Sequence, residues 1–150
     1  MKISLKKSKR QEKFKVILDT SCYVSALLSD SGASAKILEL IIEEDIFNFY
    51  TSDIIDELKK VLARDKFRLE KEKQEHFTHL IEETSFKVSK LDEFDAKACR
   101  DPNDDKFLSL AKQIDAEFII SLDEDLLVIK RLGTTRIVTP GDFLAILKES

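Results

Sequence analysis

Two kinds of hydrophobic pattern alternate along the chain. Short apolar runs such as Val16–Leu18 contain no polar residue, which is typical of strands buried on both faces of a parallel sheet. Longer stretches carry apolar residues every three or four positions, which predicts amphipathic helices. The short runs predict five strands, at Lys15–Leu18, Phe47–Tyr50, Phe86–Val88, Glu117–Ser121 and Thr135–Val138.

The helical stretches lie between and after these strands. They are 20–28, Ala33–Glu44 (with Ile41 and Ile42 on its apolar side), Asp53–Ala63, 69–84, a helix from Asp104 or Asp105 through Ile114, Asp123–Lys130 and Pro140–Leu147. Asp92–Cys99 is compatible with one more short helix. Alternation of strands and helices predicts an α/β fold, a three-layer α/β/α sandwich around a mostly parallel central sheet.

The length and composition of the chain are those of a single domain. The chain has 150 residues, enough for one domain with a real core, and only three glycines and two prolines. Residues 14–150 are expected to form that domain behind a basic N-terminal arm, 1–13. With no apolar run near the ~20 residues of a membrane span and no signal-peptide core, we expect a cytoplasmic protein.

Net charge is −4, yet basic residues gather in two places, the N-terminal arm and the segment from Lys59 to Arg68. These concentrations are either solvated faces or contacts for phosphate groups. Two histidines, His76 and His79, are expected to form a surface pair. The two cysteines, Cys22 and Cys99, are expected to be buried or half-buried thiols.

Carboxylates stand where the predicted strands end and helices begin. Asp19 follows the first strand and Asp123 follows the fourth, so parallel strands would make the two neighbours. Glu57 and Asp105 lie near helix starts that can close around them. Because several carboxylates packed together repel, such a group gains a proton or a cation. Oxygen ligands without His or Cys favour Mg²⁺ or Mn²⁺.

Four segments carry a resemblance to a known family. They are 17–28, with Asp-Thr-Ser after a strand; 51–67, with Asp-Glu-Leu-Lys-Lys; 100–111, with Asp-Pro-Asn-Asp-Asp-Lys-Phe; and 118–127, with Ser-Leu-Asp-Glu-Asp. In this order they resemble the PIN-domain family, most closely its subgroup of toxin–antitoxin toxin ribonucleases. The resemblance implies a PIN-like fold and metal-dependent cleavage of single-stranded RNA by attack of an activated water.

The resemblance also implies roles for individual residues. Asp19, Glu57, Asp105 and Asp123 match the acids that hold Mg²⁺ or Mn²⁺, with Asp125 as an auxiliary ligand. Ser21, Asp101, Asp104 and Ser121 would support that site. Lys59 and Arg64 are the basic residues that we expect to guide RNA. Two positions depart from the family pattern: Ser21 stands where Asn is common, and Leu122 stands where Gly is common.

Other functions remain open at this stage. A catalytically degenerate PIN-like scaffold would bind RNA or a protein partner without cutting. A receiver domain or a haloacid-dehalogenase-like phosphatase would also use an acidic pocket, although the latter needs Asp-x-Asp where this chain has Asp19-Thr-Ser. If the toxin resemblance holds, we expect a small antitoxin protein as partner, and a homodimer.

Overall fold

The computed structural model describes residues 13–89 and 105–149, except for the side chain of Asp105. Its centre is a six-stranded sheet of order β3-β2-β1-β4-β6-β5. The strands are β1 (Lys15–Leu18), β2 (Phe47–Tyr50), β3 (Phe86–Lys87), β4 (Phe118–Ile120), β5 (Arg131–Leu132) and β6 (Thr135–Val138). Strands β1, β2, β3, β4 and β6 run parallel, and β5 pairs antiparallel with β6.

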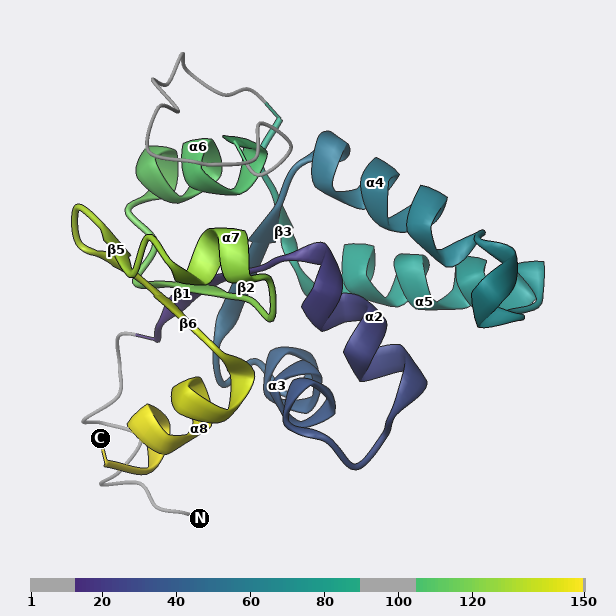
Figure 1. Ribbon diagram of the computed structural model, residues 1–150, viewed down its shortest axis with the longest axis horizontal. Helices are drawn as coiled ribbons and strands as arrows, with labels where there is room; N and C mark the ends of the chain where they lie inside the picture. Colours follow the sequence, from purple (N-terminus) through teal and green to yellow (C-terminus); the bar gives the residue numbers. More distant parts are fainter. Residues whose placement is uncertain (1–12, 90–104, 150) are drawn as a thin grey trace.

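Helices cover the sheet on both sides, as Figure 1 shows, with α6 above the strands and α3 and α8 below them. The α-helices are α2 (Thr20–Leu28), α3 (Ala33–Ile42), α4 (Ser52–Leu62), α5 (Lys71–Thr84), α6 (Asp105–Ile114), α7 (Glu124–Leu127) and α8 (Pro140–Glu149), and a 3₁₀ turn η1 spans Asp65–Phe67. The predicted three-layer α/β sandwich with a mostly parallel sheet is therefore confirmed.

The core forms where helix stripes meet the apolar strands. Val16, Ile17 and Leu18 of β1 are fully buried, as a strand covered on both faces requires. Phe118 packs edge-on against Phe143 of α8, with ring centroids 5.1 Å apart. These contacts fix β1 and β4 in the middle of the molecule, between the two helical layers.

Two local expectations differ from the structure, and a third is not tested by it. Ile42 ends α3 with 43 % of its surface exposed, because the helix stops there and the chain turns away. The predicted helix Asp123–Lys130 is only one turn long, α7, and a further strand, β5, follows it. The predicted helix Asp92–Cys99 lies outside the described residues.

Candidate active site

Asp19 lies where β1 ends and α2 begins. Its backbone N–H donates to the carbonyl of Ile120 in β4 (3.1 Å), which continues the parallel β1–β4 pairing. Its side chain accepts a hydrogen bond from the backbone N–H of Cys22 (3.1 Å) and so caps α2. The strand pairing and the helix cap together hold this carboxyl at the carboxyl edge of the sheet.

The Asp19 carboxyl is almost completely buried, with 3 % of the residue exposed. Burial raises its pKa above the ordinary value, because desolvation disfavours the charged form, and hydrogen bonds from Ser121, Ser21 and Cys22 oppose that rise. A buried carboxyl of this kind gains most from a positive charge placed beside it.

Two serines connect Asp19 to the segment after β4. The Ser21 hydroxyl donates to Asp19 Oδ1 (2.6 Å) and accepts from the backbone N–H of Leu122 (3.1 Å). The Ser121 hydroxyl donates to Asp19 Oδ2 and accepts from the backbone N–H of Asp123 (2.8 Å). The two strand ends are therefore cross-linked by side-chain hydrogen bonds, and the bulky Leu122 points outward with 47 % of its surface exposed.

Glu57 approaches this edge from α4, and both of its oxygens are engaged. The Thr20 hydroxyl donates to Oε2. The Lys106 ammonium lies 2.5 Å from Oε1, and the two side chains are 17 % and 32 % exposed, respectively. Lys106 belongs to the first turn of α6, so this ion pair joins α6 to α4 beside the acidic edge.

A pocket of about 450 Å³ brings three of the predicted acids together. It is lined by Asp19, Thr20, Ser21, Val24, Ser25, Glu57, Val61, Arg64, Phe67, Phe107 and Asp123. Asp123 caps the single turn α7 by accepting from the backbone N–H of Asp125 (2.9 Å). The pocket thus joins carboxylates from β1, α4 and the β4–α7 connection.

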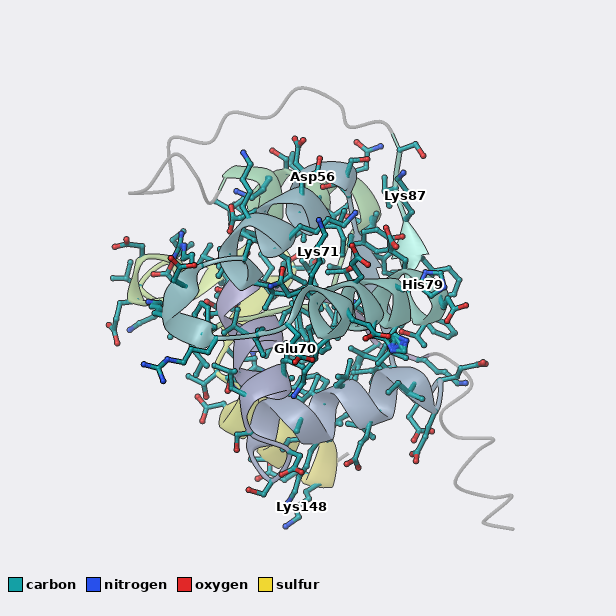
Figure 2. The ribbon with its side chains drawn as sticks, turned by 90° about the vertical axis from the view of Figure 1, so that its right-hand side faces the viewer. Asp56, Glu70, Lys71, His79, Lys87 and Lys148 are labelled. Atoms are coloured by element: carbon teal, nitrogen blue, oxygen red, sulfur yellow. The ribbon has the colours of Figure 1, made fainter. Side chains whose placement is uncertain are left out.

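The remaining predicted site residues fall into three groups. Asp105 is the first residue of α6, and Asp101 and Asp104 lie outside the described residues. Asp125 is half-buried and stands two residues after Asp123. Arg64 lines the acidic pocket, whereas Lys59 lines a second groove, between α4 and α5. Charged side chains such as Glu70, Lys71 and His79 cover the α5 face in Figure 2.

Comparison with known proteins agrees with this geometry. A protein-family model described as the PIN domain matches residues 15–125, a range that includes all four predicted acids. The chain belongs to the PIN-domain family. An uncharacterized protein of Methanocaldococcus jannaschii is 31 % identical over 119 residues, which cover 79 % of this chain and 76 % of that protein.

Membership of the PIN-domain family has two consequences. It decides between the acidic-pocket folds considered above, because the receiver and dehalogenase alternatives belong to other families. It also sets the class of activity, since PIN domains are in general nucleases, that is, hydrolases of phosphodiester bonds. Within the described residues, no helix is long and apolar enough to cross a membrane.

The donor chemistry of this PIN domain suits a divalent cation. Asp19, Glu57 and Asp123 offer hard oxygen atoms, and a cation bound beside the buried Asp19 would stabilise its charged form. However, among residues 13–89 and the described side chains of 105–149, no three His, Cys, Asp or Glu residues lie close enough together to hold a metal ion. The expected four-carboxylate cluster is therefore not formed by the side chains that the structure describes.

Three residues in or beside this PIN-domain pocket were not predicted from the sequence to have a role there. Thr20 was considered only as a helix cap, although it donates to Glu57. Lys106 stands directly after Asp105 in the motif, and that adjacency was the available signal for its place beside the acids. Phe67 has no signal of its own in the sequence, because only the path of α4 and η1 brings its ring into the pocket.

Proposed function

We propose that this PIN domain is an endoribonuclease that depends on Mg²⁺ or Mn²⁺ and cleaves single-stranded RNA. The observation that carries the proposal is the shared pocket of Asp19, Glu57 and Asp123, with Arg64 on its wall. Carboxylates suit a hard cation, and an arginine beside them suits the phosphate of a nucleic acid. Cleavage would leave a 3′-hydroxyl and a 5′-phosphate.

Asp19, Glu57, Asp105 and Asp123 are the residues that would hold the ion, with Asp125 as an auxiliary. When bound, the ion would lower the pKa of a water nucleophile and stabilise negative charge on the phosphodiester. Ser21 and Ser121 keep the Asp19 oxygens in a fixed orientation through their hydrogen bonds. Asp101 and Asp104 precede Asp105 closely in the sequence and would support it.

Basic residues would bring the RNA strand to this pocket. Arg64 is exposed at the wall of the pocket and would contact a phosphate there. Lys59, in the last turn of α4, lines the groove between α4 and α5 and would act at longer range. Their positive charges oppose the net charge of −4, which by itself disfavours a polyanion.

The test is Asp19→Asn, which removes the charge and keeps the shape of the side chain. Wild-type protein with Mn²⁺ is expected to cleave a single-stranded RNA oligonucleotide, and the variant to lose about 100-fold or more in rate. Asp53→Asn is the matched control, because Asp53 is an exposed acid in the first turn of α4. Duplex RNA and single-stranded DNA test the substrate class. A variant that cleaves at the wild-type rate would refute the site.

One observation favours a second candidate function. The Lys106 ammonium occupies Glu57 Oε1, as a cation would, and no metal-binding group of three is formed by the described side chains. A catalytically degenerate PIN scaffold that binds RNA or a protein partner would have these features. This candidate predicts that wild-type protein binds single-stranded RNA but releases no products with either Mg²⁺ or Mn²⁺.

The toxin role is a further part of the proposal, supported by the resemblance of the four motifs to the toxin subgroup. A small antitoxin protein would then bind over the acidic pocket, and the chain would form a homodimer. Purification of the chain together with the product of a neighbouring gene is the direct test. Inhibition of RNA cleavage by that product would support the role.

A further inference from the structure

The acidic pocket continues outward from the carboxylates along two helices. Glu57 and Val61 are four positions apart on α4 and so share one face, and Arg64 follows just after the end of that helix; all three line the pocket. Thr20 and Val24 are also four apart on α2. Because Thr20 is hydrogen-bonded to Glu57, the two faces start together at the sheet edge. The pocket therefore changes in character from acidic, through apolar Val24 and Val61, to Arg64.

An aromatic ring lines the same pocket as Arg64. Phe67 ends the 3₁₀ turn η1, three residues after Arg64, and is half-buried. The Lys66 ammonium lies over one face of the Phe67 ring, 5.1 Å from its centroid, so a base would stack on the other face or displace this flexible side chain. Phe67, Arg64 and Glu57 all line this one pocket. An aromatic surface with two neighbouring cations thus lies a short distance from the acidic edge.

We propose that Phe67 is a stacking surface for a nucleobase of the bound strand. A nucleotide near the scissile phosphate would place its base on the Phe67 ring, and Arg64 would face an adjacent phosphate. Base–aromatic stacking is tolerant of sequence because every base has a planar face. This inference rests on the proposed function, and it adds a binding subsite for a base to the metal-binding edge.

The charge around the ring favours a nucleotide over an apolar protein side chain as the occupant. Arg64 and Lys66 complement an anionic ligand with a planar group, which describes a nucleotide. The chain contains another aromatic cluster, Phe47, Phe49 and Phe86, in which Phe86 stacks on Phe49 at 5.2 Å. That cluster lies on β2 and β3 outside the lining of the acidic pocket, so it provides a control.

The first experiment measures binding of a single-stranded RNA oligonucleotide to the full chain in EDTA, where cleavage is not expected. Phe67→Ala is expected to weaken binding about ten-fold, and Phe67→Tyr to bind as the wild type does. Phe67→Leu retains apolar bulk and is expected to lose affinity with unchanged thermal stability. Phe86→Leu makes the same change on an exposed ring elsewhere and is expected to bind normally.

A second experiment assigns the loss of affinity to a base. One abasic residue is moved along the oligonucleotide, and wild-type affinity is expected to fall about ten-fold at one position only. In Phe67→Ala the same abasic residue should have no effect, because the partner ring is already gone. Additive losses from the two changes would overturn the stacking proposal.

The outcomes separate this proposal from the one on which it rests. If wild-type protein and Phe67→Ala bind RNA equally, the stacking subsite is wrong and the nuclease proposal stands. If wild-type protein binds no single-stranded RNA in EDTA, the stacking subsite is wrong, and the nuclease proposal is decided separately by the Asp19→Asn cleavage test. If Phe86→Leu weakens binding as much as Phe67→Leu, the loss is not specific to the Phe67 ring and the stacking subsite is wrong.

Discussion

At the scale of single residues, Asp19 has the most constrained environment in the pocket. Three donors hold its two oxygens, and burial raises its pKa. A carboxyl in this position makes the protein less stable whenever it must be ionised without a cation. On the proposed function, this loss of stability would be retained because the charge of Asp19 is needed to hold the ion.

This cost predicts a pH-dependent effect of Asp19→Asn on stability. Because the folded pKa exceeds the ordinary value of 3.8, folded protein holds the proton more tightly than unfolded protein. The wild type therefore loses stability as pH rises from about 3.8 through the raised pKa, and Asn does not. In urea denaturation with EDTA, the variant should be more stable than the wild type at pH 7, and this advantage should shrink towards pH 4.

Asn at position 19 can keep most of these hydrogen bonds. Its one oxygen can accept from Ser21 and from the Cys22 N–H, and its amide group can donate to the Ser121 hydroxyl. Asp123→Asn is the comparison, because Asp123 is only half-buried and lies in the same pocket. An advantage of Asp19→Asn that stays constant from pH 4 to pH 7 would show that ionisation is not its cause.

Individual residues of the site were predictable to different degrees. Asp19 and Asp123 follow apolar strands, so their shared edge follows from parallel pairing alone. Glu57 lies on the face of α4 that carries Val61, which is visible in its helical spacing. The hydrogen bond from Ser121 to Asp19 spans 102 positions, and the ion pair of Lys106 depends on how α6 crosses α4. Such contacts are set by tertiary packing, which a local pattern does not encode.

At the scale of elements, the start of α4 determines where Glu57 points. The Thr51 hydroxyl accepts from the backbone N–H of Ile54 (3.3 Å), and only 6 % of Thr51 is exposed. Asp53 in the first turn and Lys59 and Lys60 in the last turn suit the helix dipole. Cap and charges together define the start and register of the helix that carries Glu57 and leads into Arg64.

Loss of this cap is expected to destabilise the protein. Thr51→Ala removes the acceptor for the N–H of Ile54 and should lower the free energy of unfolding by about 1 kcal/mol, measured by urea denaturation. Ser52→Ala is the control, because Ser52 is exposed and is the first residue within the helix, so its loss should change stability by less than about 0.5 kcal/mol. Equal effects of the two substitutions would argue against the cap.

The elements themselves were largely predictable, and the exceptions have local causes. Strand β6 and helix α8 follow from their apolar patterns, but β5 has only two residues, Arg131 and Leu132. It exists because it pairs with β6 through a tight turn at Gly133, whose φ of 61° suits glycine. A strand of two residues is too short to show an alternation of apolar and polar positions in the sequence. The hairpin also limits α7 to one turn.

At the scale of the whole molecule, the order of the strands creates the site. β1 lies between β2 and β4, and all three are parallel, so their carboxyl ends meet at one edge. Strand–helix alternation predicted parallel strands, with the carboxyl ends of the first and fourth at one edge, but it did not predict the strand order. The distance between the acids was not predictable, since it depends on side-chain packing between α2, α4 and α6 around the pocket.

Binding of a divalent cation at this edge should stabilise the entire fold, and Lys106 should oppose that binding. A ligand that binds only the folded state raises the midpoint of unfolding with concentration. In the structure, the Lys106 ammonium holds the Glu57 oxygen that the ion would need. The two cations therefore compete, and Lys106→Met should remove the competitor.

Two opposite effects follow for Lys106→Met. In EDTA the variant should be less stable than wild type by about 1 kcal/mol, because a partly buried ion pair is lost and Glu57 is left without its cation. In a Mn²⁺ titration followed by thermal unfolding, the variant should gain more stability and reach half of its gain at lower Mn²⁺. Lys60→Met, an exposed change on α4, should match wild type in both conditions. If Mn²⁺ stabilised Lys106→Met no more than wild type, the ion would not bind at Glu57, and the metal site would have to be placed elsewhere.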